Sequence, residues 1–226
     1  MGKDAKRERR AALKRQKRAQ RVREEKSWRR TASQGGGSGG VLARAGEFPV
    51  GECVVSKGWR ERGLAHILVT RRSPDGSLVV GGYYVDPLCT GLKAAAVMPR
   101  LSEEDYRERV KPHIFNDPVE FEECEPGRAR ALVEGAVAYA ASLGLKPAKR
   151  WEQARRVLEG IDPDGEGLVF GREGRPCLVL RGGEKAPGVR ARLERTLGPG
   201  NYEVVEMPPG EESWISGSVT RPESTT

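Results

Sequence analysis

Four side chains in the middle of the chain have types and spacings that could support catalysis. Asp86 ends the apolar run V-V-G-G-Y-Y-V-D and is followed by Cys89 and Lys93. If residues 88–97 are helical, Cys89 and Lys93 share one face, and a nearby ammonium group or helix N-terminus lowers the pKa of a thiol. His113 lies in a polar loop, where an imidazole can act as acid or base near neutral pH. Asp86, Cys89, Lys93 and His113 are therefore the candidate catalytic residues of a hydrolase or nuclease.

The same residues also fit a structural interpretation, which the pattern favours. Asp86 would cap a helix, Cys89 would lie in the core and Lys93 would face solvent. Sequence motifs of P-loop enzymes, dinucleotide-binding enzymes, zinc proteases and serine hydrolases are missing from the chain. D-P-D-G-E-G at 162–167 lacks the ligand spacing of an EF-hand calcium loop, and the acidic run at 120–125 is typical of a solvated loop.

The elements that must position these residues begin with three β-rich runs. Residues 47–56, 63–72 and 78–86 favour strands, and S-P-D-G-S between the last two is a strong turn. A three-stranded antiparallel meander is the simplest arrangement. After it, the alanine-rich residues 87–97 indicate a short helix or turn. Ser102 is a good N-cap for a short helix at 102–110, because early acids suit the helix dipole.

The second half of the chain mixes helices and strands. Apolar residues repeat at helical spacing over 128–143, ended by Gly144, and a second helix is predicted at 148–159. The rest of the chain is predicted to form a hairpin over 167–181 that turns at Glu173-Gly174, a helix near 187–197, a strand at 201–206 and a loose tail.

The order of these elements predicts an α+β fold. Its antiparallel sheet combines the N-terminal meander with the C-terminal hairpin, and a pair of amphipathic helices packs against it. A basic N-terminal arm, helical or disordered, precedes the domain. The predicted organisation is an arm at 1–32, a Gly/Ser-rich linker at 33–46, a single domain at 47–207 and a flexible tail at 208–226.

Charge separates the arm from everything that follows it. Residues 1–31 hold 14 Lys/Arg and 4 Asp/Glu, which gives them a net charge of +10. The whole chain has 40 Lys/Arg and 32 Asp/Glu, so residues 32–226 hold 26 Lys/Arg and 28 Asp/Glu, a net charge of −2. A basic arm binds polyanions because each neutralised phosphate releases counterions. The arm has good helix formers but no apolar stripe, so folding on binding is expected. The alternatives for the arm are an inert tail, a nuclear localisation signal or a membrane-surface helix.

The candidate nucleic-acid contacts are thirteen of the fourteen basic residues of the arm together with Trp28, whose ring could stack on a base. They are Lys3, Lys6, Arg7, Arg9, Arg10, Lys14, Arg15, Lys17, Arg18, Arg21, Arg23, Trp28, Arg29 and Arg30.

The cysteine pattern argues against a metal site. Cys53, Cys89, Cys124 and Cys177 lie 36, 35 and 53 residues apart, whereas structural zinc sites use closely paired ligands. We expect four reduced thiols, no metal and no cofactor. No apolar run could span a bilayer and no secretory segment is recognisable, so a cytoplasmic protein without membrane contact is expected.

Two stretches carry a resemblance to known sequences. Y-Y-V-D-P-L-C-T-G-L-K-A-A and A-L-V-E-G-A-V-A-Y-A-A-S-L-G-L-K-P are similar to segments of a group of uncharacterised bacterial proteins with a basic N-terminal arm. The resemblance covers about half of the chain. It implies a single bacterial domain with an arm and no established activity. The excess of Arg over Lys, 29 to 11, is typical of GC-rich bacterial genomes.

The sequence therefore predicts a non-catalytic cytoplasmic accessory protein that binds RNA, possibly ribosomal RNA, through its arm. DNA is another polyanion that the arm could bind. The alternatives are a hydrolase or nuclease with its site near Asp86, Cys89 and Lys93, and an adaptor that binds an acidic protein.

Overall fold

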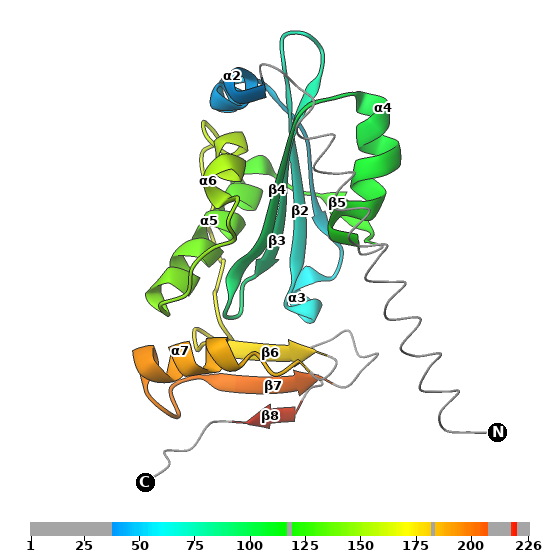
Figure 1. Cartoon of the computed structure of the whole chain (residues 1–226). Coiled ribbons are helices and arrows are strands. Elements are labelled where there is room, and N and C mark those ends of the chain that lie inside the picture. Colours follow the sequence, from blue (N-terminus) through cyan, green and yellow to red (C-terminus); the bar gives the residue numbers. More distant parts are fainter. Residues whose placement is uncertain (1–37, 117–118, 182–183, 208–217, 221–226) are drawn as a thin grey trace, which may run out of the picture. The chain divides into compact units, whose positions relative to one another are not determined.

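The computed structural model describes residues 38–116, 119–181, 184–207 and 218–220 (Figure 1). The basic arm, with every candidate nucleic-acid contact, lies outside the described residues, as does most of the predicted tail. All the helices and strands described below belong to one compact unit, Gly39–Thr226, except that the first residue of helix α2, Ser38, lies just before it. This unit begins earlier than the predicted domain, because residues of the assigned linker form helix α2 and Ala45 is fully buried in the core.

Five strands form one antiparallel sheet in the order β4-β3-β2-β1-β5. The strands are β1 (Val50–Ser56), β2 (Ala65–Arg72), β3 (Leu78–Asp86), β4 (Gly91–Leu101) and β5 (Phe121–Glu123). The predicted meander is present, and the turn between β2 and β3 is closed by Asp75, whose Oδ1 accepts from the amide and hydroxyl of Ser77. Of the short helix or turn predicted over 87–97, the turn is present at residues 87–90, but β4 follows it in place of a helix.

Helical segments surround this sheet and connect its strands. They are α2 (Ser38–Ala43), η1 (Ala45–Glu47), α3 (Trp59–Arg62), α4 (Glu103–Asp105), η2 (Tyr106–Val110), η3 (Lys111–Asn116), α5 (Pro126–Ser142), α6 (Trp151–Ala154) and η4 (Arg155–Val157). The predicted N-cap is confirmed, since the Ser102 hydroxyl accepts from the Asp105 amide at 3.0 Å. The long helix ending at Gly144 is also confirmed, whereas the predicted helix over 148–159 is reduced to the short segments α6 and η4.

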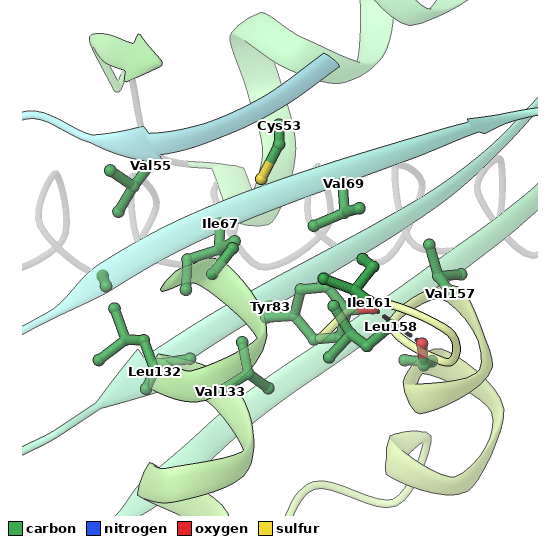
Figure 2. Packing of buried hydrophobic residues seen from close by; sticks show 14 of the residues in the cluster. Cys53, Val55, Ile67, Val69, Tyr83, Leu132, Val133, Val157, Leu158 and Ile161 are labelled. Carbon is green, nitrogen blue, oxygen red and sulfur yellow. Dashed lines mark hydrogen bonds between the residues drawn. The ribbon is translucent and has the colours of Figure 1, made fainter. Parts of the chain in front are cut away.

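The main hydrophobic core lies between the sheet and α5, α6 and η4. Side chains of β2 and β3, including Ile67 and Tyr83, pack there against Leu132 and Val133 of α5 and Leu158 after η4 (Figure 2). The Tyr83 hydroxyl is buried and donates to the Ala154 carbonyl at 2.8 Å. Burial of these apolar side chains supplies the main stabilisation of this layer.

The opposite face of the sheet is covered by α4, η2 and η3 (Figure 1). Ile114 of η3 lies directly on Gly82 of β3, where an added Cβ would be 2.4 Å from Ile114 Cδ1. A larger residue at position 82 would therefore force the end of the Ile114 side chain to move. Because both faces are covered, β2 and β3 are buried along almost their entire length.

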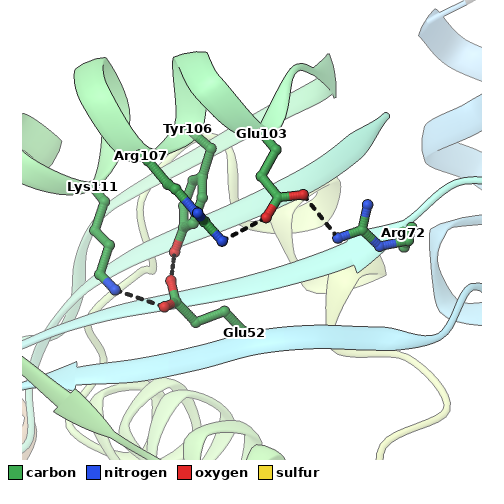
Figure 3. Close-up of polar contacts among 6 residues, drawn as sticks. All are labelled: Glu52, Arg72, Glu103, Tyr106, Arg107 and Lys111. Carbon is green, nitrogen blue, oxygen red and sulfur yellow. Dashed lines mark hydrogen bonds and ion pairs between the residues drawn. The ribbon is translucent and has the colours of Figure 1, made fainter. Parts of the chain in front are cut away.

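A polar network at the edge of this second layer ties it to β1 and β2 (Figure 3). The Glu52 carboxylate accepts from Lys111 Nζ at 2.7 Å and from the Tyr106 hydroxyl. Glu103 pairs with Arg107 at 2.7 Å and with Arg72 at 3.1 Å. Burial raises the pKa of Glu52, but its hydrogen bonds from Lys111 and Tyr106 outweigh this effect and hold the pKa below its ordinary value of 4.5.

A second, smaller sheet has the strand order β6-β7-β8. Its elements are β6 (Cys177–Arg181), α7 (Pro187–Leu197), β7 (Glu203–Met207) and β8 (Ser218–Thr220). β6 and β7 are parallel and joined through α7, whereas β8 is antiparallel to β7. The predicted turn at Glu173-Gly174 is present, but the hairpin around it is a single bridge between Arg172 and Arg175. The α+β class is confirmed.

Arg71 joins three segments of the main layer. Its buried guanidinium donates to four backbone carbonyl groups. They belong to Gly46 and Phe48, which precede β1, and to Val157 and Glu159, at and beyond the end of η4. The bonds to Phe48 and Val157 are 2.7 and 2.9 Å long. Burial lowers the pKa of Arg71, yet a guanidinium stays protonated in proteins.

Replacing Arg71 by Lys tests this clamp. Lysine has three donors on one atom and cannot reach carbonyls on several sides, so we expect unfolding to become easier by about 2–4 kcal/mol. The free energy of unfolding from urea denaturation is the measurement. The matched control is Arg72→Lys at the exposed neighbouring position, which should change stability by less than about 1 kcal/mol. Equal losses in the two variants would contradict the clamp.

The Glu52 network makes a pH-dependent contribution. Because its folded pKa lies below the ordinary value of 4.5, Glu52 stabilises the fold above that pH and ceases to do so as the pH falls through the folded value. Glu52→Gln should therefore be less stable than the natural protein near neutral pH, by about 1 kcal/mol or less for a partly exposed group. The difference should vanish in acid. Urea midpoints measured across the pH range test this, and a pH-independent difference would contradict it.

Candidate functional site

The turn after β3 is organised by the carboxylate of Asp86. Its Oδ1 accepts from the amides of Leu88 and Cys89 at 2.9 and 3.1 Å. Its Oδ2 accepts from the amide and hydroxyl of Thr90 at 3.0 and 2.6 Å. Asp86 is buried, and these four bonds occupy both oxygens. The carboxylate therefore shapes the turn and has no free position from which to accept a substrate proton.

Glycine at position 91 completes the turn. Gly91 has a φ of +67°, and an added Cβ would lie 2.6 Å from the Ala140 Cβ of α5. The turn also holds the chain that leads into the second sheet. The Pro87 carbonyl accepts from the Gly171 amide at 2.9 Å, and the Leu88 carbonyl from the Cys177 amide at 3.0 Å. Asp86 thus orders the junction between the two sheets.

The other predicted catalytic residues lie in three different environments. Cys89 is fully buried in the core of the second sheet, and this burial raises the pKa of its thiol far above the usual range. Lys93 is exposed on β4, with Nζ 5.9 Å from the ring centroid of Tyr84. His113 is exposed on η3, in the layer that covers the opposite face from α5. Asp86 and Lys93 line one pocket that neither Cys89 nor His113 lines.

This pocket has a volume of about 450 Å³ and is formed by both sheets and the connections between helices. Lys146 and Lys149 lie in the connection between α5 and α6, where the Ala148 amide donates to the Leu92 carbonyl of β4 at 3.0 Å. Three of the six lysines in residues 39–226 line it, namely Lys93, Lys146 and Lys149. All three side chains are exposed.

The pocket also contains the beginning of α7. Ala186, in a left-handed conformation with a φ of +39°, precedes Pro187, and no side chain among the described residues caps this end. Ala186 and Val189 line the pocket, so the partial positive charge of the helix N-terminus adds to that of the lysines. An anion is therefore the ligand that the pocket favours, with apolar walls from residues such as Leu92, Leu145 and Leu178.

Acidic side chains partly balance the positive charge. The carboxylates that line the pocket are Asp86, already saturated by hydrogen bonds, and Glu184. Arg181, at the end of β6, is partly buried and donates to the Arg62 carbonyl. Burial lowers its pKa, and the negative charges of Asp86 and Glu184 oppose that effect, so its charge is close to both carboxylates. Positive charge therefore remains in excess around the pocket.

The sequence analysis missed Lys146, Lys149 and the start of α7. The signals in the sequence were K-P-A-K, which overlaps the start of the second predicted helix, and the glycine-rich R-G-G-E-K-A-P-G before a helix. Neither pattern indicates a site alone, because the pocket unites segments far apart in the sequence. Within the described residues, no group of three or more His, Cys, Asp or Glu side chains could hold a metal ion. No helix described here is long and apolar enough to cross a membrane.

Comparisons of the chain with protein families, curated proteins and solved structures found no match.

Substitution of Asp86 separates a structural role from a catalytic one. Asp86→Ala removes four hydrogen bonds to a buried carboxylate and should reduce the free energy of unfolding by about 2–4 kcal/mol. Asp86→Asn keeps one acceptor oxygen but places an amide group against Thr90, so an intermediate loss is expected. Urea denaturation gives both values, with Lys93→Gln as a nearly neutral control. A fully stable Asp86→Ala protein would contradict the structural role.

Proposed function

We propose that the chain is a non-catalytic, cytoplasmic accessory protein that binds RNA through its N-terminal arm. The observation that carries this proposal is the charge division, with +10 on residues 1–31 and −2 on residues 32–226. A body without excess positive charge makes weak contacts with a polyanion over its surface at large, so affinity is expected to reside in the arm. Ribosomal RNA is the polyanion that we favour.

The pocket lysines supply a second phosphate contact in this proposal. Lys93, Lys146 and Lys149 carry half of the body's lysine charge, next to the N-terminus of α7. A lysine ammonium and a helix N-terminus are both common phosphate-binding groups. The arm and the pocket then act as separate contacts on one RNA, and neither offers a set of side chains suited to reading base edges. Binding with little sequence preference follows.

The geometry gives less support to the enzyme alternative. Its proposed carboxylate has both oxygens occupied, its proposed nucleophile is inaccessible, and its proposed base lies in another layer of the fold. An adaptor that binds an acidic protein uses the same arm, and it becomes an outcome of the experiment below.

Salt dependence of binding tests the proposal on the full chain. Labelled hairpin RNA, single-stranded RNA and DNA of the same sequence are titrated, and binding is followed by fluorescence anisotropy. With about 6–10 phosphate contacts, RNA affinity should fall by about 10³–10⁵ between about 50 and about 200 mM salt. Deleting residues 1–32 should abolish most binding and leave the body folded by circular dichroism. Salt-insensitive, tight RNA binding by residues 41–226 alone would contradict the proposal.

The pocket's contribution is tested separately from the arm. The triple substitution Lys93→Gln, Lys146→Gln and Lys149→Gln should weaken RNA binding and reduce the salt slope by about 1 for each lysine that contacts a phosphate. A charge-matched control replaces Lys57, Arg156 and Arg195, which are exposed and do not line the pocket. Equal effects of the two triple variants would exclude the pocket as a specific contact. Preference for an acidic protein over every RNA would favour the adaptor.

A further inference from the structure

Cys53 on β1 lies opposite Cys124, the residue that follows β5. β1 and β5 are antiparallel with Val54 facing Glu123, so the next facing pair is Cys53 and Cys124. The Cys124 amide donates to the Cys53 carbonyl at 3.0 Å, which fixes this alignment at the end of β5. Both are free thiols, and Cys124 packs against the hydrophobic cluster that contains Cys53. The Cys124 thiol donates to the Glu125 carbonyl at 3.5 Å. Facing strand residues have Cα separations compatible with a disulfide.

The two thiols differ in accessibility and ionisation. Cys53 is buried in the main core, with 7% of its surface exposed, whereas Cys124 is partly exposed. Its interaction with the Cys53 thiol lowers the pKa of Cys124, and Arg128 lowers it further, against the effects of burial and of Glu125 and Glu122. The same partnership, together with burial, raises the pKa of Cys53. Cys124 is thus the thiol of the pair that ionises more readily.

The position of Cys124 next to α5 supports the same assignment. Cys124 lies two residues before Pro126, the first residue of a 17-residue helix. The N-terminus of a helix stabilises a nearby negative charge, and reactive cysteines commonly occupy such positions. Arg128, in the first turn of α5, adds a full positive charge. Helix, arginine and neighbouring thiol all favour the anionic form of one sulfur atom.

We propose that Cys124 and Cys53 form a reversible oxidation site for hydroperoxides. The Cys124 thiolate attacks the peroxide O–O bond and, after a proton is taken up, yields a sulfenic acid and one molecule of water or alcohol. The Cys53 thiol then attacks the sulfenic sulfur, the S–O bond breaks, and water leaves as the Cys53–Cys124 disulfide forms. Two thiols lose two electrons to the peroxide, and exchange with an external dithiol restores them. This inference is independent of RNA binding.

The chain contains its own control for this reaction. Cys89 and Cys177 also lie near each other, since the Cys177 amide donates to the Leu88 carbonyl at 3.0 Å. Both side chains are completely buried. Burial raises the pKa of Cys177 to about 12 and raises that of Cys89 further. They should therefore stay reduced under conditions that oxidise Cys53 and Cys124.

The experiment treats the reduced full chain with hydrogen peroxide, alkylates the remaining thiols and maps the cysteines by mass spectrometry without reduction. We expect a Cys53–Cys124 cross-linked peptide, with Cys89 and Cys177 alkylated after denaturation. Dithiothreitol should reverse the product. A disulfide-linked dimer through Cys124, oxidation of all four cysteines at equal rates, or irreversible oxidation of Cys124 in the natural protein would overturn the proposal.

Variants separate the attacking thiol from the resolving thiol. Cys124→Ser should abolish the disulfide and slow oxidation of Cys53 at least tenfold. Cys53→Ala, which keeps a small apolar side chain in the core, should leave Cys124 as a sulfenic acid that dimedone traps. Cys177→Ser serves as the control and should leave the rate of disulfide formation unchanged. Circular dichroism verifies that each variant is folded. Failure of dimedone to label folded Cys53→Ala at Cys124 would also overturn the proposal.

Discussion

The buried guanidinium of Arg71 is the interaction on which the main layer depends. A charge inside a protein is costly unless polar groups replace its hydration, and within the described residues no carboxylate pairs with Arg71. Carbonyl groups before β1 and around the end of η4 replace that hydration instead. These segments have no strand partners of their own. The arginine therefore holds the irregular backbone at residues 46–48 and 157–159 against the sheet, next to the part of the core that contains Leu158.

Asp86 performs the complementary task at the other end of β3. Its carboxylate accepts hydrogen bonds from backbone amides of the turn. The carbonyl groups of Pro87 and Leu88 in the same turn accept from the amides of Gly171 and Cys177. One buried cation thus organises carbonyl groups, and one buried anion organises amides. The pocket lies where the second arrangement brings β4, the start of α7 and the α5–α6 connection together. The position of the candidate site is consequently a result of how the two sheets are joined.

Much of the fold could be predicted because its signals are local. Strands β1 to β3 follow from β-branched runs and the Asp75-Gly76 turn, and α5 from its apolar repeat and Gly144. β4 could not, since Ala94 to Ala96 favour a helix, and pairing with β3 overrides that preference. The parallel pairing of β6 with β7 likewise depends on a crossover through α7. Asp86 was recognised as a special position, but its four hydrogen bonds required the folded turn.

Saturation by hydrogen bonds distinguishes structural polar groups from those available for binding or chemistry. Arg71 and Asp86 are buried and use their polar atoms within the fold, and Glu52 is held by Lys111 and Tyr106. Lys146 and Lys149 differ, because their side chains are exposed and no carboxylate within the described ranges pairs with them. Cys124 is likewise partly exposed, whereas Cys89 is fully buried. A sequence indicates residue types, but only the fold reveals which polar atoms remain accessible, and here these include the pocket's ammonium groups and the Cys124 thiol.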